Sequence, residues 1–292
     1  MHPSVRGVAA SVLALAVWAL GGSSAAAWCR LTTSTETAIG PGACVTDGIP
    51  LAWNRRCMSY SLFVGGSKRL TVEELRPIIF QSYSAWTSVR CDGVPIQLDV
   101  AETEAASLCD RSVFNSEGGN LNTVAFVADW VARDHDPDAF ALTSVWHDSA
   151  GLIHDADMEL NEENRTFDDC PVGASCPFVD VQNVVTHEAG HFFGLAHSSD
   201  PEATMLASAP TGEIKKRTLA ADDIDGICNA YPPGSLPDTC DFTPSGGFAA
   251  ECRVEDGCGC RAPGSTRRFP RFAAFAVGAV ALAMAWARRR RR

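Results

Sequence analysis

The chain has 292 residues, 12 cysteines and a formal net charge of −11, a length that allows one or two domains with a sizeable core. Between residues 28 and 260 it contains 14 Lys+Arg and all 35 Asp+Glu, a formal charge of −21. So acidic a body disfavours nucleic acids and anionic surfaces as partners.

The first 27 residues are typical of a secretory signal peptide. Arg6 precedes an apolar run at residues 8–20, and three alanines at 25–27 provide small residues for cleavage before Trp28. All 12 cysteines follow this segment. In an exported chain they are expected to form disulfides rather than to stay free.

Proximity along the chain suggests two of the disulfides. The pairs are Cys170 with Cys176 and Cys240 with Cys252. Zinc ligation by cysteines is the alternative, but no short Cys–Cys gap is repeated as a pair of pairs. The remaining partners do not follow from the sequence.

Residues 28–52 are rich in Thr, Gly and Pro and predict an irregular lead-in. The helix that we expect at residues 71–86 begins at Thr71, with Glu74 three residues later as in a capping box. Its apolar positions recur about every 3.6 residues and form one face. The strands expected from alternating or apolar runs are residues 59–64, 94–100 and 123–127, followed by a hairpin of residues 139–146 and 152–160.

Two more helices are expected in the second half of the chain. Asp180 is placed to cap the first, and the second covers residues 220–231 and stops at Pro232-Pro233. Segments of strand, helix, three further strands and two helices predict an α+β domain with a mixed sheet.

The helix after Asp180 contains the motif H-E-x-x-H-x-x-G-x-x-H at residues 187–197. His187 and His191 are four apart and share a helix face, so both imidazoles can reach one metal ion. Gly194 can take the positive φ that ends the helix and returns His197 to the same ion. Three imidazoles leave the fourth zinc position open, as in catalytic sites, and Glu188 can reach a water there without being a ligand.

The C-terminal part reads as a tether and a tail. Residues 234–270 contain Cys, Gly and Pro without a periodic apolar face, and residues 272–287 are apolar and precede five arginines. Sixteen apolar residues are marginal for a bilayer, which usually needs about 20. The arginines would stay cytoplasmic, so the body faces outward. A buried core helix is the alternative.

Residues 53–233 resemble the catalytic domain of a metzincin and, within that clan, of the matrixins. The zinc motif matches throughout, and the stretch after His197 resembles the family's approach to its Met-turn, with Met205 as the methionine. Residues 219–227, followed by Tyr231, resemble its final helix. The resemblance implies a zincin-like fold with a twisted five-stranded mixed sheet, three main helices and a zinc cleft.

The resemblance also implies an activity. It is zinc-dependent endopeptidase activity on protein or peptide substrates, with His187, His191 and His197 as metal ligands, Glu188 as general base and Met205 as a hydrophobic floor. An extended substrate would add to the hairpin strand, and residues 207–218 would wall the pocket for the residue after the scissile bond. The chain is expected to act as a monomer. A non-catalytic surface binding protein on the same scaffold is the alternative function.

Other family features match less well. Residues 90–95 loosely resemble the propeptide's cysteine switch but follow the first helix, so Cys91 is expected to be a disulfide partner. Asp155 and Asp157 offer a calcium site, against the favoured reading of acidic residues at a solvated strand end. The histidines at 135, 147 and 154 do not reproduce the family's structural zinc site.

Residues 252–292 resemble a C-terminal sorting signal of the MYXO-CTERM type. The matching features are the segment 257–261 (Gly-Cys-Gly-Cys-Arg), a short spacer, an apolar helix and an arginine tail. This implies an exported protein held at the cell surface or outer membrane, or released to the extracellular space. A retained anchor, with membrane contact through the helix at 271–292, is the alternative to cleavage.

Overall fold

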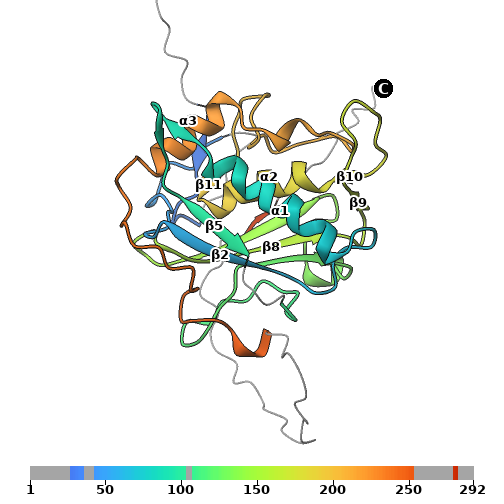
Figure 1. Cartoon of the computed structure of the whole chain (residues 1–292), viewed down its shortest axis with the longest axis horizontal. Coiled ribbons are helices and arrows are strands. Elements are labelled where there is room, and N and C mark those ends of the chain that lie inside the picture. Colours follow the sequence, from blue (N-terminus) through green and yellow to red (C-terminus); the bar gives the residue numbers. More distant parts are fainter. Residues whose placement is uncertain (1–26, 36–42, 103–106, 253–278, 282–292) are drawn as a thin grey trace, which may run out of the picture.

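A twisted mixed sheet forms the centre of the protein (Figure 1). The computed structural model describes residues 27–35, 43–102, 107–252 and 279–281. The five main strands follow the order β7-β8-β6-β2-β5, in which only β7 is antiparallel to its neighbour. The five-stranded mixed sheet is therefore confirmed. The strands are β2 (Cys57–Leu62), β5 (Asp99–Glu102), β6 (Thr123–Val127), β7 (Ala141–His147) and β8 (Ile153–Asn161).

A further short strand, β12 (Ala279–Ala281), lies antiparallel against β7. Its neighbours on β7 are Leu142, Thr143 and Ser144. The outer edge of β7 therefore accepts an extended segment through backbone hydrogen bonds.

Three helices complete the α+β domain. α1 and α2 lie side by side across the same face of the sheet (Figure 1), and the Trp86 indole N–H donates to the carbonyl of Thr186 at 2.8 Å where they touch. The Thr71–Glu74 capping box of α1 is confirmed. The three helices are α1 (Val72–Thr87), α2 (Val181–Phe192) and α3 (Ala221–Ala230).

The strand expected at residues 94–100 is interrupted. Gln97 has a φ of +63°, in the left-handed region, which breaks the extended backbone. Only the first two of these residues and the last two belong to strands. The remaining short elements are β1 (Cys29–Arg30), β3 (Arg90–Cys91), β4 (Val94–Pro95), β9 (Phe167–Asp168), β10 (Val179–Asp180), β11 (Leu195–Ala196), and the 3-10 turns η1 (Val131–Arg133), η2 (Lys215–Arg217) and η3 (Ala250–Cys252).

Five disulfides join the described residues. The pair Cys170–Cys176 is confirmed, and so is the expectation that Cys91 is a disulfide partner. The expected pair Cys240–Cys252 is wrong, because the segment after α3 runs back along the sheet and each cysteine meets a partner far away in sequence. Closeness in the sequence does not predict disulfides that form when a later segment folds back on an earlier one. The pairs are Cys29–Cys44, Cys57–Cys240, Cys91–Cys228, Cys109–Cys252 and Cys170–Cys176.

Both terminal predictions concern residues that the structure largely leaves out. The expected signal peptide lies outside the described residues except for its last residue, Ala27. The expected apolar helix at 271–292 also lies outside them, apart from the three residues of β12. Within the described ranges, no helix is both long and apolar enough to cross a membrane.

Candidate metal centre

α2 is the element that carries most of the motif, and it is buried nearly throughout. Every residue of the helix except Gln182 is buried, because the sheet, α1 and the segment after residue 205 surround it. Its N-terminus is capped as expected: the Asp180 carboxylate accepts the backbone N–H of Asn183 at 2.7 Å.

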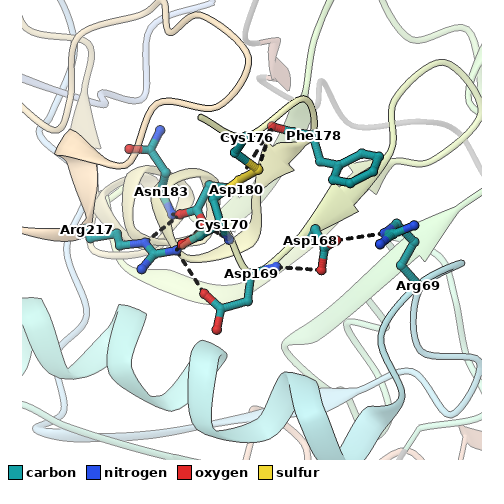
Figure 2. The surroundings of a disulfide bond; sticks show 9 residues. All are labelled: Arg69, Asp168, Asp169, Cys170, Cys176, Phe178, Asp180, Asn183 and Arg217. Carbon is teal, nitrogen blue, oxygen red and sulfur yellow. Dashed lines mark hydrogen bonds and ion pairs between the residues drawn. A yellow bond between two sulfur atoms is a disulfide. The ribbon is translucent and has the colours of Figure 1, made fainter. Parts of the chain in front are cut away.

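Asp180 also ties the start of α2 to two other segments. Its second oxygen accepts the backbone N–H of Cys170 at 3.0 Å, beside the Cys170–Cys176 disulfide (Figure 2). Arg217 donates to Asp180 at 2.8 Å through Nε and to Asp169 at 2.9 Å. A disulfide-closed loop and the segment before α3 therefore hold the helix start in one position.

Gly194 makes the turn that returns the third histidine. Its φ is +84°, which confirms the expected left-handed conformation, and its N–H donates to the His191 carbonyl at 2.9 Å. A Cβ at this position would lie 2.4 Å from the Leu51 carbonyl oxygen. Both the backbone angle and the close approach therefore require glycine.

The three histidines of the motif meet at one point. The centroids of the His187 and His191 rings are 5.0 Å apart, and that of His197 lies 5.3 and 4.9 Å from them. One ligand atom from each lies within 4.8 Å of the other two. All three Nε2 atoms are buried and have no hydrogen-bond partner. Three partnerless lone pairs that converge in this way fit a metal ion, and the donor set suits zinc.

Two of the histidines are oriented by backbone carbonyls. His187 Nδ1 lies 2.6 Å from the Thr204 carbonyl oxygen, and His191 Nδ1 lies 2.8 Å from that of Leu195. Because a carbonyl only accepts, Nδ1 carries the proton and the Nε2 lone pair is free for a metal. Burial also lowers the pKa of all three rings, to about 4 for His191 and about 2 for His197. The neutral form that binds metal is therefore favoured.

Glu188 lies beside the three imidazoles without joining their group. Its Oε2 accepts the hydroxyl of Thr143, on β7, at 2.7 Å, while Oε1 is buried without a partner. Burial raises the pKa of Glu188 to about 7, and the Thr143 hydrogen bond and Lys216 act in the opposite direction. One carboxylate oxygen is thus fixed by the sheet and the other is free to exchange a proton.

Met205 packs directly beneath the motif helix. A Cβ on Gly190 would lie 2.1 Å from the Met205 sulfur, so glycine is needed for this approach. The turn is held by Asp223 of α3, whose carboxylate accepts the N–H groups of Thr204 at 2.7 Å and Met205 at 3.0 Å. The carbonyl of Thr204 is the one that orients His187, so Asp223 also supports that ligand.

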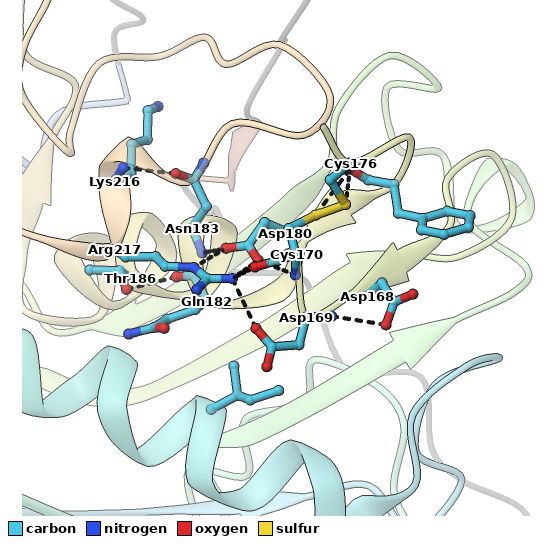
Figure 3. A network of polar contacts seen from close by, with 12 residues as sticks. Asp168, Asp169, Cys170, Cys176, Asp180, Gln182, Asn183, Thr186, Lys216 and Arg217 are labelled. Atoms are coloured by element: carbon cyan, nitrogen blue, oxygen red, sulfur yellow. Dashed lines mark hydrogen bonds and ion pairs between the residues drawn. A yellow bond between two sulfur atoms is a disulfide. The ribbon is translucent and has the colours of Figure 1, made fainter. Parts of the chain in front are cut away.

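A buried lysine lies behind His187. Lys216 has 1% of its surface exposed, and its backbone N–H donates to the Asn183 side chain at 2.7 Å (Figure 3). Its ammonium donates to the Leu206 carbonyl. Its Nζ is 3.4 Å from His187 Nδ1. Burial lowers the pKa of Lys216 to about 8.

The acidic residues proposed as a calcium site are placed differently from the favoured expectation. Asp155 and Asp157 are 0% and 1% exposed, so the prediction that they are solvated residues at a strand end is wrong. Asp157 accepts the backbone N–H groups of Val113 at 2.9 Å and Thr123 at 2.8 Å. Burial raises the pKa of both carboxyl groups. Two carboxyl groups fall well short of the six to eight oxygens that calcium takes.

The other histidines are dispersed. His135 bonds to Glu159 at 2.8 Å, His147 to the carbonyl of its neighbour Asp148, and His154 contacts the Asp148 carboxylate at 3.4 Å. Among the described residues, the only other metal-like group is Cys57, Asp99 and Cys240, and its two sulfurs already form a disulfide.

Thr143, Asp223 and Lys216 were not singled out from the sequence. Thr143 is an inward residue of a predicted strand, and Asp223 stands in the segment that resembles the family's last helix. Neither position shows by itself that it contacts the motif. Lys216 lies in the segment 207–218 that was expected to wall the substrate pocket, but its burial was not expected, because a lysine in a polar segment normally lies at the surface.

Comparison with known proteins gives a consistent result. A family model described as Matrixin matches residues 52–232. Metalloendoproteinase 1-MMP of Arabidopsis thaliana is 28% identical over 187 residues, covering 62% of this chain and 44% of the relative. Metalloendoproteinase 2-MMP of the same plant is 25% identical (69% and 50%), and matrix metalloproteinase-C of Caenorhabditis elegans is 24% identical (70% and 34%). The chain spans half or less of the length of these relatives.

Proposed function

The chain belongs to the matrixin family, and from that premise we propose that it is a zinc-dependent endopeptidase that cleaves proteins or peptides. One observation carries the proposal. Three buried Nε2 atoms converge without partners, and beside them lies a carboxylate with one unbonded oxygen. Open metal ligands next to a free base are what metal-assisted hydrolysis requires.

His187, His191 and His197 would hold the zinc. When bound, zinc lowers the pKa of a coordinated water towards about 7 and polarises the scissile carbonyl. Glu188 Oε1 would take the proton of the attacking water and pass it to the leaving nitrogen. Thr143 would orient the carboxylate through Oε2, and Met205 would support the imidazoles without taking a proton.

The substrate would lie along the edge of β7. Support comes from β12, which pairs with the residues around Thr143, the residue bonded to Glu188. An extended peptide on this edge would present its backbone to the metal ligands. Residues 207–218 would then contact the side chain that follows the scissile bond.

The remaining organisation is also a proposal. Residues 1–27 would be a signal peptide, 28–52 a lead-in, 53–233 the catalytic domain, 234–270 a tether and 271–292 a sorting signal or membrane anchor. Five disulfides support export. The protein would act as a monomer at the cell surface or outside the cell, without nucleic-acid partners.

Cleavage of casein or gelatin by the purified chain from Trp28 onwards tests the function. We expect activity that a chelator abolishes and about one equivalent of zinc restores. Activity that resists chelation would contradict the proposal. A zinc-loaded protein that cleaves nothing would instead favour the alternative, a binding protein on the same scaffold; zinc content alone does not separate the two.

A further inference from the structure

Lys216 is a buried ammonium without a carboxylate partner. No carboxylate of the described residues forms an ion pair with its Nζ, which contacts only the Leu206 carbonyl and His187 Nδ1. Its neighbours differ: Lys215 is paired with Glu202 at 3.7 Å, and Arg217 is paired with carboxylates at the start of α2. Burying an unpaired charge is costly, so the site lacks an anion.

Lys216 is held at both ends. Its backbone N–H donates to the Asn183 side chain on α2 at 2.7 Å, and its ammonium donates to the Leu206 carbonyl. Figure 3 shows that the Arg217 side chain runs from this point to Asp180, whereas the Lys216 side chain leaves in another direction. The two consecutive basic residues of η2 therefore have different interactions. Arg217 forms a salt bridge with Asp180, whereas Lys216 places its ammonium next to the ring of His187.

The ammonium is close enough to the metal position to meet a substrate side chain. Nζ lies 3.4 Å from His187 Nδ1, the ring nitrogen that faces away from the converging Nε2 atoms. Only the imidazole ring of His187 therefore separates the ammonium from the buried Nε2 atoms that would hold a metal. A substrate carboxylate that meets this ammonium would lie next to the metal ligands.

The nearby carboxylates of Glu188 and Glu213 form no hydrogen bond with the Lys216 ammonium. The Glu188 carboxylate directs Oε2 to Thr143, and Oε1 of Glu213 is buried without a partner. Neither forms an ion pair with Lys216. Glu213 does add negative charge to the surroundings, so it should oppose rather than assist an incoming carboxylate.

We propose that Lys216 is a specificity-determining residue whose ammonium binds a substrate carboxylate just after the scissile bond. This inference rests on the proposed peptidase function and narrows its substrates. Peptide bonds that precede Asp or Glu are favoured, because their carboxylate supplies the missing partner. An apolar side chain at the same place leaves the ammonium unpaired. The carboxyl terminus of a short peptide offers the same chemistry from a different source.

Matched peptides that differ only after the scissile bond test the preference. With the zinc-loaded protein, kcat/KM for Asp should exceed that for the isosteric Asn by about tenfold, the value of one charge-assisted hydrogen bond. Lys216→Met should reduce the Asp/Asn ratio to about one. Arg111→Met removes an exposed charge outside residues 207–218 and should leave the ratio unchanged. Glu213→Gln should increase it.

Two further measurements keep the test independent of folding and of turnover. Lys216→Arg retains the charge and should retain an Asp/Asn ratio well above one. The Glu188→Gln protein, loaded with zinc, should bind the Asp peptide more tightly than the Asn peptide in calorimetry. Peptides that end one residue after the bond, as free acid or amide, separate a chain terminus from a side chain.

The outcomes are distinct. An Asp/Asn ratio near one in the unmodified protein, or a ratio that Lys216→Met does not change, overturns the role of Lys216 while peptidase activity stands. If a free terminal carboxylate raises kcat/KM more than Asp does, the group that binds Lys216 is the carboxyl terminus of the peptide, and the proposed preference for an acidic side chain is overturned. Failure of the zinc-loaded protein to cleave any peptide, including those with Leu, overturns the proposed function and this inference with it.

Discussion

The protein buries two polar clusters on opposite faces of its sheet, and the two differ in the hydrogen-bond and ion-pair partners of their side chains. The histidine cluster consists of His187, His191 and His197, on the face covered by α2. The acidic cluster consists of Asp155, Asp157 and Glu159, alternate residues of β8 that point to the other face. Both are largely buried, with only His197 partly exposed, and both come from stretches that the sequence offered as metal sites.

The partners distinguish them. In the acidic cluster, Glu159 bonds to Arg133 and to His135, and Asp157 accepts two backbone N–H groups. The raised pKa of Asp155 favours its neutral form beside Asp157. Both carboxyl oxygens of Asp155 also lie buried without a hydrogen-bond donor, but they belong to a single residue. In the histidine cluster, three residues each direct a partnerless Nε2 atom to one point. Buried unbonded atoms therefore do not identify a metal centre by themselves, whereas their convergence from several residues does.

Removing the base should produce the largest effect and would separate chemistry from metal binding. Glu188→Ala deletes the proton carrier but none of the three imidazoles. We expect kcat/KM to fall by about 10³-fold, within the range of general acid–base catalysis, while one zinc per chain remains by elemental analysis. Glu202→Ala, which removes a carboxylate whose side chain is 74% exposed, is the control. Retained cleavage by the first variant would remove Glu188 from the mechanism.

Metal-dependent stability should divide the two clusters. Zinc at about 1,000 times its dissociation constant should stabilise the chelated protein by about 4 kcal/mol, because it binds only the folded state. Calcium should leave Tm unchanged, since the acidic cluster offers too few oxygens. Thermal unfolding with each ion provides the measurement. A calcium-dependent rise in Tm that Asp157→Asn abolishes would place an ion in the acidic cluster instead.

Breaking the acidic cluster should cost stability without changing the metal centre. Arg133→Met leaves Glu159 buried without its guanidinium and should lower the free energy of unfolding by about 3 kcal/mol. Zinc content and kcat of the folded protein should not change. The double variant Arg133→Met/Glu159→Leu should recover most of the loss in denaturant unfolding. If it recovers none, the pair is not the source of the effect.

The smallest expected effect concerns pH. Because burial raises the native pKa of Asp155 and Asp157, the folded chain holds protons that the unfolded chain releases above about pH 4. Their contribution to stability is therefore greatest below pH 4 and is lost as pH rises through the native pKa, which is about 7 for Asp157. Asp155→Asn should flatten this decline by about 1 kcal/mol between pH 5 and 8. The exposed Asp238→Asn is the control, and an unchanged slope in Asp155→Asn would contradict the assignment.

Local rules account for what the sequence predicted well. The Thr71 capping box, the cap at Asp180 and the turn at Gly194 depend on residues within a few positions of one another. The same holds for the shared helix face of His187 and His191, which follows from the helical period. The fold class followed from the order of such local elements.

Tertiary structure decided the rest. Thr143 meets Glu188 across 45 positions, Asp223 supports Met205 across 18, and Lys216 reaches His187 across 29. The Cys57–Cys240 disulfide spans 183. The burial of Asp157 likewise depends on a distant segment, in which the backbone N–H of Val113 donates to its carboxylate. The sequence predicted the metal ligands because the motif lies within one helix and the turn that follows it. The residues that support these ligands belong to other elements, and no local sequence pattern predicts which elements pack together.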